Sequence, residues 1–500
     1  MPDIVLSTLN ARYIHCSMGL RYLQANMGAL QARTQLREYT INQRAMDIVE
    51  DLLLQPPRII GFGVYIWNVE QTEAVIRLLK TISPETVVII GGPEVSYEYD
   101  QQSIVAHADH LIVGQSDLAF ADTCQQLLAH QPVNKILHAL PFELADIQLP
   151  YAYYTDTDIA HRIIYVEASR GCPFKCEFCL SALDKTAVPF DLDLFLQHMQ
   201  ALYDRGARHF KFVDRTFNLK IETSARIMEF FLAKHNPDLF LHFELIPDHL
   251  PDKLKTIIAE FPPHSLQFEV GIQTLNNDTQ QLISRKQNNT RARDNLLWLN
   301  QNSHAHIHAD LIIGLPGEDM ASFGRGLNQL YAMKPAEIQV GLLKRLRGTP
   351  IIRHTQNFDM RYNPQPPYTI LSNNQIDFAT MQRLTRFARY WDMIINSGRF
   401  KHSQALLLGD DVFENFMQLC DWLHAATGQT HEFALERLFN LVHQFLTEAK
   451  QYAADEVVAA LLEDYRRSGL KGQAKFSRQI ESVEKQKSVQ NVQRQKRHLL

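Results

Sequence analysis

Short apolar runs alternate with helix-like segments along most of this chain, and this alternation limits the possible folds more than any other feature. The first series lies in residues 1–130 and reads DIVLSTL, QLREYTIN, RIIGFGVYI, TVVIIGG and HLIVG. Near-continuous Val and Ile runs are typical of strands buried on both faces of a parallel sheet. This β–α order predicts a doubly wound α/β domain, in which ligands bind at the carboxyl ends of the strands.

A second series fills residues 161–350. Its apolar runs read RIIYVEAS, HFKFVDR, LFLHFELI, SLQFEVGIQ, HIHADLIIGLP and EIQVGLLK. Six such runs with helix-like segments between them predict a partial (β/α)6 barrel, whose site should lie at the carboxyl ends of its strands. Between the two series, residues 131–160 hold prolines, tyrosines and acids without a clear period. We expect this segment to be a linker.

The last third of the chain has a different pattern. Residues 370–465 carry apolar side chains at spacings of three and four, which predicts an all-α accessory domain. The tail, 466–500, is rich in Gln, Lys and Arg and poor in apolar residues, so we expect it to be disordered. A solvated basic tail is favoured there over a segment that binds RNA.

The length and composition of the chain suit a protein of several domains, each with its own hydrophobic core. The chain has 500 residues, of which 45% are hydrophobic and 21% charged, with a formal net charge of −5. A balance this close to neutral argues against nucleic acid or an anionic membrane as the main partner. No stretch reaches the about 18 unbroken apolar residues of a membrane helix. The first residues lack the pattern of a signal peptide, so we expect a cytoplasmic location.

Three of the six cysteines are bunched in EASRGCPFKCEFCLSA, at Cys172, Cys176 and Cys179. Thiolate ligands select zinc or iron–sulfur clusters. A structural zinc ion takes four protein ligands, and no fourth cysteine or histidine follows at zinc-finger spacing. A cubane cluster can be held by three cysteines with one iron left open. The segment therefore predicts a [4Fe–4S] cluster in preference to zinc or a redox-active trio.

The C-x3-C-x2-C spacing, with Phe178 inside it and a strand-like run just before it, resembles the radical S-adenosylmethionine (SAM) superfamily. The resemblance implies that the open iron is chelated by the amino and carboxylate groups of SAM. It also implies that an electron from the cluster releases a 5′-deoxyadenosyl radical, and that a flavodoxin or ferredoxin supplies the electron. Phe178 matches the position whose ring packs near the adenine.

Further segments of the second series resemble SAM-binding segments of this superfamily. The resemblance implies that Asp214 in FVDRTFN contacts the amino end of SAM and that Glu244 in FELIPDHL contacts the ribose. EVGIQTLNNDTQQLISRKQ resembles a segment of the coproporphyrinogen dehydrogenase branch that supplies Gln273 and Arg285. A guanidinium suits the methionine carboxylate because it offers two parallel donors. DLIIGLPGE would lay its backbone along the adenine at Ile313, Gly314 and Leu315.

A doubly wound domain ahead of such a barrel resembles the cobalamin-binding subgroup, in which some members carry a C-terminal helical domain of unassigned function. The resemblance implies that residues at the strand ends line the cobalamin cleft. Glycines there would let the nucleotide tail approach the backbone closely. The residues concerned are Asn10, His15, Gly63, Tyr65, Gly91, Gly92 and Gly114.

His15 lies in the turn after the first apolar run, and three roles are open for it. Many cobalamin carriers use Asp-x-His-x-x-Gly here, with the histidine as lower cobalt ligand, but this chain has Tyr13 at the aspartate position and one extra residue before Gly19. His15 could ligate cobalt, bond the corrin amides or cap the helix that begins near Ser17. Because the aspartate normally orients the histidine, its absence favours cobalt without a protein nitrogen. The neighbouring Cys16 is expected to be a small buried residue.

HAHIHAD contains His304, His306 and His308, which share one face of a strand with Asp310. Alternating histidines can bind a metal. A barrel strand also turns alternate residues inward, and the sequence favours a polar barrel floor over a metal site.

The resemblance implies a cobalamin-dependent radical SAM enzyme that methylates an unactivated carbon. Rearrangement or cyclisation with the same cofactors remains open. A methylthiotransferase would need three further N-terminal cysteines, and only Cys16 and Cys124 are available. A non-catalytic sensor that holds a cluster and a corrinoid is the alternative outside enzymology. No motif in the sequence names the substrate.

Overall fold

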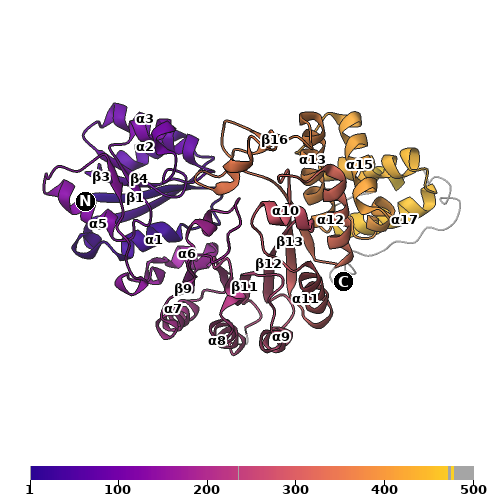
Figure 1. Cartoon of the computed structure of the whole chain (residues 1–500), viewed down its shortest axis with the longest axis horizontal. Helices are drawn as coiled ribbons and strands as arrows, with labels where there is room; N and C mark the ends of the chain where they lie inside the picture. Colours follow the sequence, from indigo (N-terminus) through magenta and orange to yellow (C-terminus); the bar gives the residue numbers. More distant parts are fainter. Residues whose placement is uncertain (1, 235, 471–473, 478–500) are drawn as a thin grey trace, which may run out of the picture. The chain divides into compact units, whose positions relative to one another are not determined.

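The computed structural model describes residues 2–234, 236–470 and 474–477 (Figure 1). The chain divides into two compact units. The first comprises 1–326 and 332–378, and the second comprises 327–331 and 379–500. The predicted fold class, a doubly wound α/β domain and a partial (β/α)6 barrel followed by an all-α domain, is confirmed. Residues 478–500 of the predicted disordered tail lie outside the described residues.

A sheet of six parallel strands forms the first part of the first unit, in the order β2-β1-β3-β4-β5-β6. The strands are β1 (Ile4–Asn10), β2 (Thr34–Thr40), β3 (Ile59–Gly63), β4 (Val87–Gly91), β5 (His110–Val113) and β6 (Ile136–His138). After β2 the chain crosses back over β1 to reach β3. The carboxyl ends of β1 and β3 therefore flank the switch point, where doubly wound sheets bind ligands.

Helices cover both faces of this sheet (Figure 1). The helices α1 (Met18–Ala25) and α5 (Ala119–Leu128) share one apolar core with the sheet, and α2 (Ala45–Leu53), α3 (Val69–Ile82) and α4 (Ser103–His107) share the other. Successive strand residues feed the two cores in turn because their side chains point to opposite faces. This explains why the strands read as continuous apolar runs in the sequence.

The segment predicted as a linker, 131–160, contains regular structure. It supplies β6, which pairs with β5, and then two short 3-10 turns, Leu144–Asp146 and Tyr151–Tyr153. The helix α6 (Asp156–His161) follows. A three-residue edge strand is too short to show a period in sequence, which is why the pattern read as a linker.

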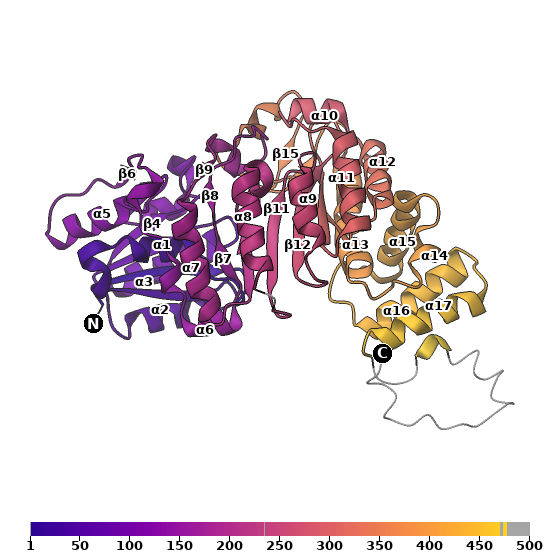
Figure 2. The same ribbon diagram turned by 90° about the horizontal axis from the view of Figure 1, so that it is seen from below.

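The second sheet also has six parallel strands, in the sequential order β14-β13-β12-β11-β10-β7. They are β7 (Ile164–Val166), β10 (His209–Phe212), β11 (Phe240–Leu245), β12 (Leu266–Gln273), β13 (His306–Ile313) and β14 (Glu337–Leu342). The helices are α7 (Leu192–Asp204), α8 (Ile221–Leu232), α9 (Asp252–Ala259), α10 (Asn277–Leu282), α11 (Asn289–Asn302) and α12 (Met320–Ala332). Figure 2 shows α8, α9 and α11 along one side of the strands. The sheet is the predicted partial barrel, with β7 and β14 at the ends of its order.

The two faces of this sheet differ in polarity. Toward the helices it packs aromatic rings, among them Phe212, Phe231 and Phe243, all buried, with the Phe212 and Phe243 centroids 4.5 Å apart. Alternate residues turn the other way, and there Lys211 pairs with Glu269 at 3.5 Å. The face of the partial barrel that points away from the helices therefore carries charged side chains.

Short elements complete the first unit. The two-residue strands β8 (Ser169–Arg170) and β9 (Val188–Pro189) pair antiparallel and bracket the cysteine segment. The strands β15 (Arg361–Tyr362) and β16 (Ile370–Ser372) form a second small ladder. The remaining 3-10 turns are Gly28–Arg33, Tyr99–Gln101, Leu180–Leu183, Phe217–Leu219 and Pro350–His354.

The second unit is helical. Its helices are α13 (Phe378–Trp391), α14 (Gln404–Leu408), α15 (Val412–Thr427), α16 (Leu435–Gln444) and α17 (Ala454–Arg467), with π-helical turns at Asp392–Asn396 and Phe445–Ala449 and a 3-10 turn at Lys475–Ser477. Buried Asp464 accepts hydrogen bonds from the backbone of His402 and Ser403, each at 2.8 Å, and so joins α17 to the start of α14. Among the described residues, no helix is long and apolar enough to cross a bilayer.

Candidate functional site

The cysteine segment leaves the sheet after β7 and is held as a closed loop. The β8–β9 ladder brackets it, and the backbone N–H of Cys172 donates to the carbonyl of Asp184 at 2.9 Å. Gly171 has φ +89°, and a Cβ there would lie 2.5 Å from the carbonyl oxygen of Thr186. A glycine is therefore required where the loop closes on itself.

All three thiols of this loop line one cavity of about 380 Å³. Burial raises the pKa of the Cys172 and Cys176 thiols. Among the residues that line the cavity there is no other cysteine and no histidine. This donor set fits a cubane cluster with one iron left without a protein ligand, and it is one ligand short of a structural zinc site.

Glu177, inside the same loop, anchors it to the rest of the barrel. Its buried carboxylate accepts hydrogen bonds from Arg353 Nε at 2.7 Å and Ser284 Oγ at 2.5 Å, and lies 2.9 Å from His354 Nε2. Glu177 could not be predicted from the sequence, because its partners lie more than 100 residues away in the chain. The loop is therefore fixed by charge as well as by backbone pairing.

Gln273 and Arg285 also line the cysteine cavity. Arg285 Nη1 donates to Cys176 Sγ at 3.6 Å, and its Nη2 donates to the carbonyl of Gly271 and, at 2.8 Å, to Gln287. Gln273 ends β12 with φ +67°, a left-handed conformation that is uncommon for a non-glycine residue. The predicted amide and guanidinium thus come together beside the thiols.

Glu244 and Phe178 also line the cysteine cavity, and Glu244 forms an ion pair with Arg215. Arg215 Nη1 donates to both Glu244 oxygens, at 2.6 and 2.7 Å. Burial raises the pKa of Glu244, and the Arg215 charge opposes the rise. Sequence reasoning missed Arg215, although it directly follows the predicted residue of FVDRTFN.

Asp214 does not line the cysteine cavity. Its carboxylate accepts hydrogen bonds from the Ala168 backbone at 3.0 and 3.2 Å and from Ser169 Oγ at 2.6 Å. Burial raises its pKa to about 7. The structure therefore gives Asp214 a role in fastening the strand that leads to the cysteines, and its predicted contact with SAM lacks support from this geometry.

The end of β13 meets the cavity one residue earlier than predicted. Ile312 lines the cavity, whereas Ile313, Gly314 and Leu315 do not, and the last two follow the strand. Asp310, on the same face as Ile312, lines it as well. Its Oδ1 is buried without a hydrogen-bond partner among the described residues, and burial raises its pKa to about 8.

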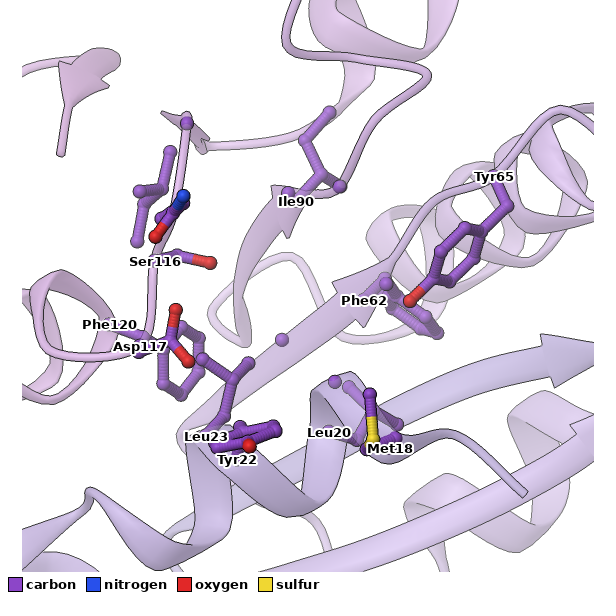
Figure 3. Close-up of a pocket in the computed structure, with 18 of the residues that line it drawn as sticks. Met18, Leu20, Tyr22, Leu23, Phe62, Tyr65, Ile90, Ser116, Asp117 and Phe120 are labelled. Carbon is purple, nitrogen blue, oxygen red and sulfur yellow. The ribbon is translucent and has the colours of Figure 1, made fainter. Parts of the chain in front are cut away.

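A second cavity, of about 330 Å³, lies over the carboxyl ends of the first sheet (Figure 3). Figure 3 shows Tyr65 on one side of it and Asp117 with Phe120 on the other. The structure brings together here most of the strand-end residues that the sequence analysis named. They are Gly63, Tyr65, Gly91, Gly92 and Gly114.

Two glycines in the lining of this cavity are required by close packing in its walls. Gly92 has φ +117°, and a Cβ there would lie 2.4 Å from the carbonyl oxygen of Val64. Gly61, also in the lining, would place a Cβ 2.6 Å from the Phe120 ring. Glycines at the strand ends also let a ligand approach the backbone closely. Sequence reasoning missed the α1 face that closes the cavity, including Gly19 and Tyr22.

Asn10 and His15 do not line this cavity. Asn10 Nδ2 donates to Glu38 at 2.9 Å, and His15 Nδ1 lies 2.7 Å from the hydroxyl of Tyr165 in the barrel.

The cap of α1 is Ser17, whose Oγ accepts from the Leu20 backbone at 3.3 Å. Cys16 is buried, and its Sγ donates to the carbonyl of Ile163 at 3.1 Å. The turn after β1 thus joins the sheet to the barrel.

The two cavities border the same stretch of chain. The glycine-lined cavity touches Glu167, Arg170, Gly171 and Asp184, and the cysteine cavity touches residues between these. Arg170 Nε donates to Glu167 at 2.8 Å. The segment that presents the thiols is therefore also a wall of the first sheet's cavity.

Comparison with protein families gives three matches along the chain. Residues 4–123 match the model of the B12 binding domain, and residues 166–329 match that of the radical SAM superfamily. Residues 356–499 match a family described as a protein of unknown function, DUF4080.

Two curated relatives are similar to parts of the chain. A 2-(S-pantetheinyl)-carbapenam-3-carboxylate methyltransferase of Streptantibioticus cattleyicolor is 23% identical over 308 residues, 55% of this chain and 45% of the relative. An uncharacterised methyltransferase of Pyrococcus horikoshii is 23% identical over 213 residues, 37% of this chain and 46% of the relative. The chain thus spans less than half the length of these two relatives.

Solved structures share the fold. The radical SAM methyltransferase TsrM from Kitasatospora setae, with cobalamin and a [4Fe–4S] cluster bound, has a TM-score of 0.58 at 13% identity and covers 73% of this chain and 82% of its own. The cobalamin-dependent SAM radical enzyme OxsB, with aqua-cobalamin and SAM bound, has a TM-score of 0.61 at 12% identity and covers 97% of this chain and 83% of its own. At these identities the similarity establishes the fold.

Proposed function

Because this chain belongs to the radical SAM superfamily, in the subgroup with an N-terminal B12 binding domain, we propose that it is an enzyme that methylates an unactivated carbon. Its cofactors are a [4Fe–4S] cluster, SAM and cobalamin. When bound, the cluster and SAM supply a 5′-deoxyadenosyl radical, and cobalamin supplies a transferable methyl group. The curated relatives, both described as methyltransferases, support methylation.

In this proposal the cysteine cavity holds the cluster and SAM. Cys172, Cys176 and Cys179 are the cluster ligands. Arg285 offers planar donors to the SAM carboxylate, since its guanidinium already lines the cavity beside Cys176. The Glu244 carboxylate suits the ribose hydroxyls, and we add Asp310 as a further polar contact because its Oδ1 has no partner among the described residues.

The glycine-lined cavity holds cobalamin. Gly91, Gly92 and Gly114 line it without side chains, so a nucleotide tail can lie against their backbone. Tyr65 offers a ring and a hydroxyl from the loop after β3. His15 bonds Tyr165 and does not line this cavity, which supports cobalt without a protein nitrogen.

One observation carries the proposal: the cysteine loop forms part of both cavities. A reaction that uses a radical from one cofactor and a methyl group from the other needs both cofactors to open onto the same substrate. The polar inner face of the barrel, with the Lys211–Glu269 pair, would hold that substrate through polar contacts. We further propose a cytoplasmic location and a flavodoxin or ferredoxin as electron donor.

The first test is SAM cleavage by anaerobically reconstituted full-chain protein with dithionite. We expect a [4Fe–4S] absorbance band, one bound cobalamin and release of 5′-deoxyadenosine. Cys176→Ala should abolish cluster and cleavage, whereas Cys420→Ala, which changes a cysteine buried in α15, should keep both. Cleavage that survives Cys176→Ala would contradict the proposal.

The second test follows the methyl group. SAM labelled in its methyl group is incubated with the enzyme, the reductant and a small-molecule extract of the source cells. A new labelled product with a methylated carbon is expected. Cleavage without label transfer would instead indicate rearrangement or cyclisation, and label arriving together with sulfur would indicate methylthiotransfer. Cobalamin binding without any SAM cleavage would indicate a sensor.

A further inference from the structure

Two histidines and a glutamate meet at the amino ends of two neighbouring barrel strands, the opposite edge from the cysteine cavity. His306 is the first residue of β13 and Glu337 the first of β14, and His308 is the register partner of Glu337. The two histidines are two residues apart on one strand, so their side chains lie on the same face. The sequence pattern had joined His304 and Asp310 to them, and the structure substitutes Glu337.

The three side chains converge on one point. His306 Nε2 lies 3.1 Å and His308 Nε2 lies 3.3 Å from the same oxygen, Glu337 Oε1. One ligand atom from each residue falls within 4.8 Å of the others. A tetrahedral zinc ion with bonds of about 2.0–2.1 Å holds its ligand atoms about 3.4 Å apart. The two distances to the carboxylate are within tenths of an ångström of this value, and ligand atoms up to 4.8 Å apart would close on the ion by rotation of their side chains.

We propose that His306, His308 and Glu337 bind a divalent transition-metal ion of the zinc class. Two imidazoles and one carboxylate form a ligand set that such ions take in proteins, with a fourth position left for water. The side chains are 46%, 21% and 29% exposed, so an ion can enter from solvent and keep a water ligand. This site is separate from the cofactor cavities and does not depend on the proposed methylation.

Gln267 on β12 supports the arrangement. Its side-chain amide lies 3.3 Å from His308 Nδ1. When Nε2 binds a metal, Nδ1 carries the proton, and a 180° rotation of the Gln267 amide lets its oxygen accept a hydrogen bond from Nδ1–H. Such a partner fixes the ring orientation and strengthens the ligand.

The ion would fasten the end of an open barrel. β14 stands at the end of the strand order and pairs only with β13 in this sheet, among the described residues. A metal bound by both strands would hold their amino ends in register. A plain hydrogen-bonded cluster, in which Glu337 accepts from both imidazoles, holds the same atoms together without binding zinc, so zinc binding separates the two cases.

The test uses the full-chain protein with its cluster reconstituted, dialysed against EDTA and titrated with Zn²⁺ in competition with a chromophoric chelator. We expect one zinc per chain. Zinc-edge X-ray absorption should show only nitrogen and oxygen neighbours, at about 2.0–2.1 Å. His306→Ala and Glu337→Gln should weaken binding by at least about tenfold.

His304→Ala is the matched control, since it removes an exposed histidine of the same segment that lies outside the cluster. It should bind zinc as the parent protein does. Iron content and circular dichroism identify any variant that fails to fold. Sulfur neighbours at about 2.3 Å, which would place the zinc on cysteines, or unchanged affinity in both cluster variants, or no zinc bound by the folded parent protein, would each overturn the proposal.

Discussion

Arg170 donates to the carboxylate of Asp117 at 2.9 Å, and this ion pair joins the segment just before the cysteines to the loop after β5. The same guanidinium lies 4.4 Å from the ring centroid of Tyr22 on α1. Glu167 is its third partner. One cation thus ties the cysteine loop to two walls of the glycine-lined cavity, so the loop and that cavity are held in a fixed relation.

Arg170→Met should destabilise the first unit strongly. The Arg170–Asp117 pair is largely buried, at 16% and 11% side-chain exposure. The substitution leaves the carboxylates of Asp117 and Glu167 without their cation. Removing one partner of a buried pair costs about 3–5 kcal/mol. Arg226→Met is the control, because the Arg226–Asp193 pair is 52% and 74% exposed and should contribute less than about 1 kcal/mol. Equal losses of unfolding free energy in the two variants, measured by urea unfolding, would contradict a stabilising role for the Arg170–Asp117 pair.

Gly92→Ala should reduce both stability and cobalamin binding. The added Cβ would lie 2.4 Å from the Val64 carbonyl, and φ +117° is strained for alanine. Gly28→Ala carries backbone strain alone, since its φ is +53° and no atom lies within 4 Å of the built Cβ. Strain alone costs about 1–2 kcal/mol. We expect a larger loss for Gly92→Ala by thermal unfolding, with cobalamin binding lost only in that variant.

Arg285→Lys should weaken SAM binding while the cluster remains. The guanidinium reaches Cys176, Gly271 and Gln287 at once, and an ammonium cannot reproduce that planar geometry. The expected loss of SAM affinity is tenfold or more, or about 1.4 kcal/mol. Equilibrium dialysis against SAM, with iron content as the internal standard, measures it. Arg293→Lys, at an exposed pair on α11, should bind SAM as the parent does.

Asp214 should make stability depend on pH. Its pKa is raised by burial from 3.8 to about 7, so the folded protein retains a proton that the unfolded chain releases above pH 3.8. The contribution of this group is full below pH 3.8 and is lost as the pH rises to about 7. The loss between pH 5 and 8 is about 3 kcal/mol.

Asp214→Asn removes the titration and keeps an oxygen that can accept from Ala168. We expect its unfolding free energy to fall less between pH 5 and 8 than that of the parent. Asp193→Asn, which changes an exposed carboxylate, should follow the parent profile. Parallel profiles for Asp214→Asn and the parent would show that Asp214 is not buried as a neutral acid.

The sheets could be predicted because each long strand is visible as an apolar run in its own local sequence. Eleven apolar runs correspond to β1–β5, β7 and β10–β14, and the sequential order of the second sheet follows from simple βα repetition. β6 could not be predicted, because its three residues become a strand only by pairing with β5. The strand β6 forms only because β5 lies beside it, and the local sequence of β6 does not show that pairing.

The predicted site residues also differ in whether local sequence or tertiary contacts decide their position. Glycines at strand ends come together in one cavity because parallel strands end at a common edge, so their grouping follows from secondary structure alone. Asp214 and His15 occupy similar strand-end positions, yet each side chain bonds a neighbouring segment and lies outside the cavity named for it. Which way a loop side chain turns depends on the partner that packs against it.

The sequence by itself determined the cysteine trio, the two parallel sheets and the helical region, because these depend on spacing within short segments. Only the tertiary structure decided that Arg170 ties the cysteine segment to Asp117, that Arg215 pairs with Glu244 and that Glu337 joins His306 and His308. Ionic and polar contacts of this kind act over a few ångströms between residues far apart in sequence. They exist only after the strands have been set side by side.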